Sequence, residues 1–189
     1  MDEFFKNKYR VASTRLQHWD YSWPGLYYVT ICTKNRRCNL AEVKNYNVYL
    51  SDIGKIVFEC WLEIPKHFNK VELDDWIIMP NHLHGIILIK NNYNDFGSGN
   101  CRDARSRVST ANRFGPLQPK SLSAIIHAFK SSTKRSCNKN DLADFQWQAG
   151  FYEHIVKDEG DLARIREYIA QNPNNWVSDR NNPKNFEEI

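Results

Sequence analysis

The stretch IIMPNHLHGIILI, residues 77–89, is almost wholly apolar, yet His82 and His84 stand one residue apart near its middle. The Pro-Asn pair directly before the histidines is typical of a tight turn. The flanking runs are rich in β-branched and other apolar residues, as strands are. The pattern therefore predicts two antiparallel strands, 70–79 and 82–89, that meet at this turn.

The two histidines of the second strand predict a candidate metal site. Side chains alternate between the faces of a strand, so His82 and His84 project from the same face, about 7 Å apart along the backbone. Two neutral imidazoles at that spacing can hold one divalent cation. A pair of hydrogen-bonded structural histidines gives the same pattern, so a metal site needs a further ligand.

The rest of the chain supplies the other elements of an α+β domain. The runs 26–33 (LYYVTICT) and 145–156 (FQWQAGFYEHIV) are typical of strands, and apolar residues repeat at helical spacing after Ser51 and after Ser121 or Ser123. The resulting order, β-α-β-β-α-β, predicts a ferredoxin-like split βαβ fold with an antiparallel sheet. Two helices would cover one face of this sheet, and a C-terminal helix is the candidate cover for the histidine face.

This last helix is predicted to start at Asp158 or Asp161 and to stop at Pro173. Tyr168 and Asn172, four residues apart, lie one turn from each other at the edge of its apolar stripe. If the stripe packs on the histidine face, the Asn172 amide can complete a metal site with the Tyr168 phenol beside it. The structural alternative is that Tyr168 is a boundary aromatic and Asn172 ends the helix. The stripe consists of Leu162, Ile165 and Ile169.

A tyrosine next to a divalent cation has a specific chemical use. The phenol can attack a phosphodiester when a metal polarises a nonbridging oxygen and stabilises the leaving 3′-oxygen. The products are a 5′-phosphotyrosine bond and a free 3′-hydroxyl. Because the covalent bond keeps the energy of the phosphodiester, the step can be reversed onto another 3′-end, which amounts to strand transfer.

MPNHLHGIILI, followed downstream by YIAQNP (168–173), resembles the single-tyrosine HUH transposases, and among them the REP-associated tyrosine transposases. The name HUH describes a His-hydrophobic-His motif, here His82-Leu83-His84. The resemblance covers about residues 10–175. It includes the segments STRLQHWDYSWPGLYYVTICTKNR, FGPLQPKSLSAIIHAFKSSTKR and FQWQAGFYEHIVKDEGDLARIREYIAQNP.

The resemblance implies a role for each matching residue. It implies that Tyr168 is the nucleophile and that the metal is Mg²⁺ or Mn²⁺, with single-stranded DNA near a hairpin as the substrate. His154 matches a recurrent Glu-His pair; a role in orienting the metal ligands or a core position fits as well as a role as a ligand itself. Tyr152 is the rival nucleophile, ranked lower because it lies in a strand. The implied metal ligands are His82, His84 and Asn172.

The charge is uneven along the chain. The net charge is +4, but residues 90–140 hold ten Lys/Arg against two Asp, so this segment carries +8 and the remainder −4. Such a concentration is typical of a polyanion partner. It includes a basic stretch, 91–119, that predicts a flexible flap. The side chains expected to contact DNA phosphates are Arg102, Arg105, Arg107, Arg113, Lys130, Lys134 and Arg135.

The predicted organisation is an N-terminal extension over 1–25, one HUH domain over 26–175 and a polar tail over 176–189. Trp19 and Trp23 of the extension can stack on bases or belong to the core. The longest apolar runs are too short to cross a bilayer, and the N-terminus lacks a signal-peptide core, so a cytoplasmic protein without membrane contact is expected. Either a monomer or a homodimer fits.

Two other functions share part of this pattern. One is a catalytically silent protein that binds DNA repeats, and the other is a relative of replication initiators or relaxases. The presence of both histidines, the tyrosine and the asparagine together argues against the silent protein. The five cysteines form no CxxC pair, which argues against a zinc knuckle or a disulfide framework.

Overall fold

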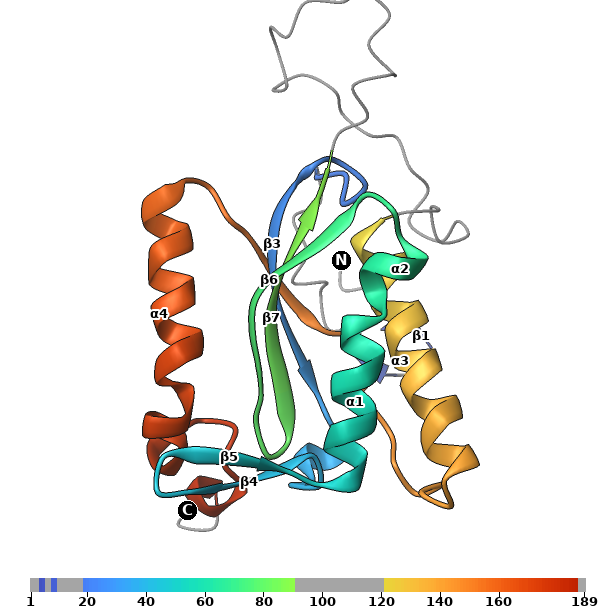
Figure 1. Ribbon diagram of the computed structural model, residues 1–189, viewed down its shortest axis with the longest axis vertical. Coiled ribbons are helices and arrows are strands. Elements are labelled where there is room, and N and C mark those ends of the chain that lie inside the picture. The colour runs from blue at the N-terminus through green and yellow to red at the C-terminus, as the bar shows by residue number, and fades with distance from the viewer. Residues whose placement is uncertain (1–3, 6–7, 10–18, 91–120, 187–189) are drawn as a thin grey trace, which may run out of the picture.

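The computed structural model describes residues 4–5, 8–9, 19–90 and 121–186 (Figure 1). The predicted flap at 91–119 therefore lies outside the described residues. A short two-stranded ribbon near the N-terminus joins β1 (Phe4–Phe5) and β2 (Lys8–Tyr9). In the part of the chain that the structure describes, no helix is both long and apolar enough to cross a membrane.

A four-stranded antiparallel sheet forms the centre of the fold. Its strands are β3 (Gly25–Cys32), β6 (Val71–Ile78), β7 (His82–Ile89) and β8 (Tyr152–Ile155), in the order β6-β7-β3-β8. Every neighbouring pair is antiparallel. With one helix before β6 and another before β8, this is the ferredoxin-like arrangement. The α+β fold predicted from the sequence is confirmed.

Helices α1 (Asp52–Leu62) and α3 (Leu122–Lys139) cover one face of the sheet, and the single-turn helix α2 (Ile64–His67) follows α1 (Figure 1). Their starts are fixed by Ser51 and Ser121, whose hydroxyls accept hydrogen bonds from backbone N–H groups in the first turn. Apolar side chains of both helices fill the main core against the sheet, among them Val57, Trp61, Leu122, Ile125, Ile126 and Phe129.

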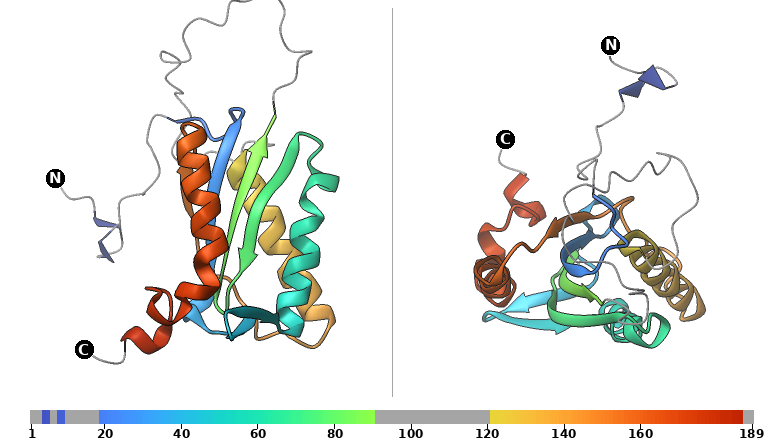
Figure 2. Two further views of the ribbon diagram at one scale, coloured as in Figure 1. Left: turned by 60° about the vertical axis from the view of Figure 1, so that its left-hand side comes forward. Right: turned by 90° about the horizontal axis from the view of Figure 1, so that it is seen from above.

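Helix α4 (Glu159–Asn175) covers the opposite face, so the sheet lies between two helical layers (Figure 2). Its N-cap is Asp158, which accepts a hydrogen bond from the backbone N–H of Asp161. A bidentate ion pair joins Arg166 of α4 to Asp74 of β6, with N···O distances of 2.9 and 2.6 Å. The apolar stripe of α4 packs on the histidine face as predicted, in a cluster with Tyr28 and Ile86.

The end of α4 differs from the sequence prediction. The helix does not stop at Pro173 but continues to Asn175, and the backbone N–H of Trp176 then bonds to the carbonyl of Pro173. A proline inside a helix loses one hydrogen bond. In the last turn that loss is small, and the buried side chains of Ile169 and Asn172 hold the helix in place just before it.

Three further segments close the lower end of the molecule in Figure 1. A hairpin joins β4 (Ala41–Lys44) to β5 (Asn47–Leu50), and a short 3₁₀ turn, η1 (Lys34–Arg36), follows β3. After α4 the chain forms two more 3₁₀ turns, η3 (Trp176–Ser178) and η4 (Pro183–Phe186). The part of the predicted polar tail that is described is therefore folded.

Candidate metal and nucleophile site

The two histidines lie at the start of β7, on the face that α4 covers. Both are buried, His82 with none of its surface exposed, and their ring centroids are 4.5 Å apart. The alternation of the strand brings the two rings together, as the sequence predicts. The cover comes from the same chain, because α4 follows β8 and folds back over the sheet.

The ring of His82 is held by the asparagine of the preceding turn. Nδ2 of Asn81 donates to the carbonyl of Arg36 at 3.0 Å and to that of Asn181 at 2.6 Å. Oδ1 of Asn81 must therefore be the group that faces His82 Nδ1, at 2.8 Å. Since this oxygen only accepts, His82 carries its proton on Nδ1 and keeps a lone pair on Nε2.

The ring of His84 is held by β3. Its Nδ1 lies 2.7 Å from the Tyr28 hydroxyl and 2.9 Å from Thr30 Oγ1. A hydroxyl oxygen can accept a hydrogen bond from Nδ1–H, which leaves the lone pair of Nε2 able to bind a metal. Both histidines thus have an orienting partner on one nitrogen, the arrangement that metal-binding histidines commonly show.

Asn172 of α4 supplies a third polar atom to the same place. Its side chain is 2% exposed, and its Nδ2 donates to the carbonyl of Tyr168 at 2.7 Å. Its Oδ1 is buried without a hydrogen-bond partner, as are Nε2 of His82 and Nε2 of His84. One unsatisfied buried polar atom costs about 1–3 kcal/mol, so these three atoms are candidate ligand atoms.

These three atoms fit a divalent cation by their chemistry. Imidazole nitrogen and amide oxygen are both ligands of such ions. Within the described ranges no group of three His, Cys, Asp or Glu side chains could hold a metal. A three-ligand site at the two histidines would therefore need a ligand of another residue type. Asn172 meets this need.

Burial keeps both imidazoles neutral. Desolvation lowers the pKa of His82 to about 4, although the charge of Asp179 and the Asn172 side chain oppose the shift. Desolvation and the neighbouring His82 lower the pKa of His84 as well. A neutral imidazole is the form that can bind a metal.

Tyr168 lies next to this cluster and is open to solvent. Its ring centroid is 5.3 Å from that of His84 and 6.4 Å from that of Tyr28, and the residue is 45% exposed. Partial burial and the charge of Asp179 raise its pKa, while Asn172 and Arg180 lower it to a lesser extent. The phenol is therefore protonated at neutral pH.

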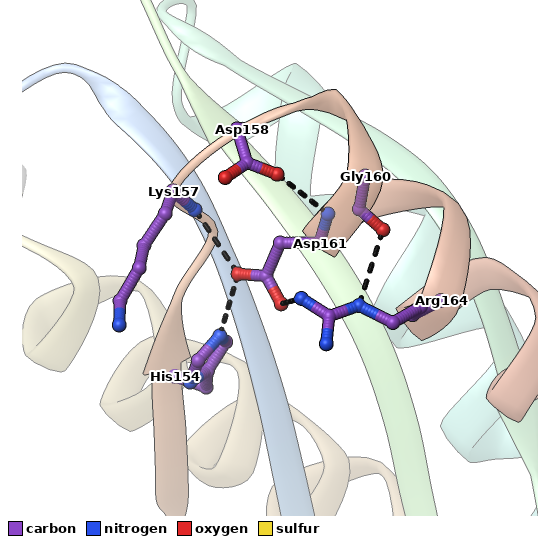
Figure 3. A network of polar contacts seen from close by, with 6 residues as sticks. All are labelled: His154, Lys157, Asp158, Gly160, Asp161 and Arg164. Carbon is purple, nitrogen blue, oxygen red and sulfur yellow. Dashed lines mark hydrogen bonds and ion pairs between the residues drawn. The ribbon is translucent and has the colours of Figure 1, made fainter.

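A cavity of about 650 Å³ opens beside Tyr168 and Asn172. Tyr152, the rival nucleophile, also lines it, but in β8, where its neighbour in the sheet is Thr30 rather than His84. His154 lines the cavity too, and its Nε2 lies 2.8 Å from Asp161 Oδ2 (Figure 3). The structure thus brings Tyr168, and not Tyr152, into ring contact with His84.

The segment after α4 forms part of the cavity wall, which the sequence did not suggest. Ser178, Asp179 and Arg180 line the cavity. The segment is fixed because the Arg36 guanidinium donates to the carbonyl of Arg180 at 2.9 Å, and because Asn181 accepts from Asn81 as described above. The only local signal for this packing is the polar, asparagine-rich sequence DRNNP, residues 179–183.

The three predicted DNA-contacting residues that the structure describes lie away from this site. Lys130, Lys134 and Arg135 belong to α3, on the other side of the sheet. The Lys130 amine donates to the carbonyls of Gln148 and Gly150, and burial lowers its pKa to about 8. The Lys134 amine donates to the carbonyls of Ala143 and Phe145. Outside the described residues lie Arg102, Arg105, Arg107 and Arg113.

The two tryptophans of the N-terminal extension lie at the edge of the core. Trp19 packs partly buried against the main core, and its indole N–H donates to the Tyr27 hydroxyl at 3.2 Å. Trp23 contacts Trp19 edge to face, with ring centroids 5.3 Å apart. This packing favours the core alternative for Trp19 over base stacking.

Comparisons with known proteins agree with this fold. No family model matches the chain. An uncharacterized protein from Haemophilus influenzae is 37% identical over 169 residues, which is 89% of this chain and 91% of that protein. The chain belongs to the same family as this protein. Among solved structures, a REP-associated tyrosine transposase bound to a REP hairpin has a TM-score of 0.57 at 17% identity, over 88% of this chain and 74% of that one. This likeness supports the fold.

Proposed function

We propose that this protein cleaves single-stranded DNA in a metal-dependent reaction and transfers the strand through a covalent bond to Tyr168. The observation that carries the proposal is a half-exposed phenol next to three buried, unsatisfied ligand atoms, at the edge of a cavity. A structural role explains neither the orphaned atoms nor their convergence from two elements far apart in the sequence.

His82, His84 and Asn172 would hold Mg²⁺ or Mn²⁺. A bound cation of this kind would polarise a nonbridging phosphate oxygen and stabilise the leaving 3′-oxygen. The chain's own residues prepare this site in two ways. Asn81 and the Tyr28–Thr30 pair orient the two rings, and burial keeps both rings uncharged.

Tyr168 would act as the nucleophile. Its phenolic oxygen bonds to phosphorus, and the bond from phosphorus to the neighbouring 3′-oxygen breaks. The phenol releases its proton, and the 3′-oxygen takes up a proton to become a hydroxyl. The product keeps a high-energy phosphodiester on the protein, so attack by a second 3′-hydroxyl reverses the step and joins a new strand.

One cation of the cavity wall, Arg180, suits a phosphate, although it lies beside the carboxylate of Asp179. The Arg180 guanidinium is close enough to lower the pKa values of Tyr168, Tyr28 and both histidines. A cation there also stabilises the negative charge that builds up on phosphate oxygens during transfer. A DNA hairpin is a reasonable substrate to test first, because the solved neighbour with this fold is bound to a REP hairpin.

The test is a covalent-adduct assay. Wild-type protein is incubated with Mg²⁺ or Mn²⁺ and a 3′-labelled single-stranded DNA that contains a hairpin, and the products are run on a denaturing gel. The label stays on the fragment joined through its 5′-phosphate, so we expect a shifted band that protease removes.

The control is Tyr168→Phe, which removes one oxygen and should leave folding and DNA binding intact. We expect no shifted band from this variant. A band that persists in Tyr168→Phe would contradict the assignment and make Tyr152 the next candidate. DNA binding without any band in wild type would favour the catalytically silent DNA-binding protein.

A further inference from the structure

The cavity extends beyond Tyr168 toward the start of α4, into a region that the cleavage step does not use. Three side chains define this outer pocket: Tyr152 and His154 from β8, and Arg164 from α4. Arg164 lies four residues before Tyr168, as Tyr168 lies four before Asn172, so the three share one side of the helix.

The spacing along α4 matches the repeat of a DNA strand. Four residues of helix rise about 6 Å. This is close to the separation of consecutive phosphates along a single strand. If the phosphate under attack lies at Tyr168, the next phosphate of the strand therefore comes within reach of Arg164.

Arg164 is held ready for such a contact. Its Nε donates to the carbonyl of Gly160 at 3.3 Å, and one terminal nitrogen lies 3.5 Å from Asp161 Oδ1 (Figure 3). The side chain is nevertheless 77% exposed, so its remaining N–H groups face solvent. Holding a guanidinium in place before binding reduces the entropy that a phosphate contact costs.

The carboxylate of Asp161, which also lines the cavity, already has several hydrogen-bond partners. Asp161 accepts from the backbone N–H of Lys157 at 3.1 Å and lies 2.8 Å from His154 Nε2, besides the contact with Arg164 (Figure 3). The hydrogen bond to His154 is the largest of the effects that lower the pKa of Asp161. The Asp161 side chain thus holds His154 and Arg164 at the edge of the outer pocket.

Tyr152 gives the outer pocket an aromatic wall. It lies on β8, an edge strand of the sheet, and is 49% exposed although its ring lines the cavity. An exposed aromatic side chain next to a cation is a common way to hold one nucleotide of a single strand, since every base has a face that can stack.

We propose that the outer pocket binds the nucleotide adjacent to the cleaved phosphate, with Arg164 on its phosphate and Tyr152 stacked on its base. The ligand is thus a single-stranded segment that runs along α4. This inference rests on the proposed function, because the strand is placed by the phosphate at Tyr168.

The phosphate contact is tested by removing charges on both partners. Fluorescence anisotropy measures how a labelled hairpin DNA with a single-stranded flank binds to the Tyr168→Phe protein, which does not cleave. Each phosphate of the flank is replaced in turn by an uncharged methylphosphonate. We expect one position to weaken binding by about tenfold, and Arg164→Ala to weaken it by about as much.

The decisive experiment combines the methylphosphonate DNA with the Arg164→Ala protein. In the Arg164→Ala protein the methylphosphonate at that position should have no further effect, whereas Lys55→Ala, on α1 across the sheet, should leave the full effect in place. If binding by the Arg164→Ala protein is weakened by a methylphosphonate at every position as much as binding by the Tyr168→Phe parent, the proposed contact between Arg164 and a phosphate is wrong.

The base contact is tested in the same way with abasic sites. Tyr152→Phe should bind normally, whereas Tyr152→Ala should weaken binding by about tenfold and lose its sensitivity to one abasic site in the flank. Tyr49→Ala removes a tyrosine of β5 that is also exposed but does not line the cavity, and it is the control. Unchanged sensitivity in Tyr152→Ala would overturn the stacking. All these experiments measure binding and not cleavage. The outer pocket can therefore be confirmed even if no adduct forms at Tyr168, and it can be refuted even if an adduct forms.

Discussion

Substitutions of Asn81 can separate the contribution of this residue to stability from its contribution to metal binding. Its amide nitrogen ties the turn before β7 to Arg36 and Asn181, and its amide oxygen holds His82. Asn81→Ala removes all three contacts at once. At a net value of about 1 kcal/mol for each buried hydrogen bond, we expect the free energy of unfolding to fall by about 3 kcal/mol.

The same substitution should weaken metal binding. Without Asn81 Oδ1, the proton of His82 is no longer held on Nδ1 and the ring is free to turn. Loss of such an orienting partner lowers metal affinity by about 10–100-fold, or about 1.4–2.7 kcal/mol. Calorimetric titration with Mn²⁺ measures the affinity, and urea unfolding in the presence of EDTA measures the stability without metal.

Asn81→Asp separates the two effects. The carboxylate keeps an acceptor for His82 but cannot donate to the carbonyls of Arg36 and Asn181. This variant should therefore lose stability as Asn81→Ala does, yet keep metal affinity near the wild-type value. Equal loss of Mn²⁺ affinity in both variants would refute the orienting role, and so would unchanged affinity in Asn81→Ala.

Three further predictions follow from other parts of the structure. A Cβ on Gly85 would lie 2.4 Å from the Trp61 ring, so Gly85→Ala should lower the free energy of unfolding by about 1–3 kcal/mol in urea titrations, and an unchanged midpoint would contradict this packing. The hydrogen bond from Arg166 lowers the pKa of Asp74, so this pair stabilises the fold above the ordinary carboxyl pKa and less as the pH falls through the lowered value. Urea unfolding across an acid series should show that Arg166→Ala is less acid-sensitive than wild type. EDTA should abolish adduct formation by the wild type, and Mg²⁺ or Mn²⁺ should restore it. The His84→Ala protein should form no adduct after metal is added and should bind no Mn²⁺ in a calorimetric titration.

The sequence by itself determined the main elements and which of the candidate site residues share a face. The two-residue period of strand 82–89 placed both histidines on one face, and the helical period after Asp158 placed Tyr168 one turn before Asn172. Ser51 marked the start of one helix, and Ser121 or Ser123 the start of another, of which the structure selects Ser121. These features depend on residues close together in the chain, so local rules suffice to predict them.

Only the tertiary structure decided how α4 lies on the sheet and which groups support the histidines. The contact of Asn81 with Asn181 spans 100 positions in the sequence, and that of Arg36 with Arg180 spans 144. No local pattern encodes such pairs, because a buried asparagine and an exposed one look alike in a sequence. The lysines of α3 show the same limit: their charge suggested DNA, whereas folding brought backbone carbonyls within reach of two of their amines.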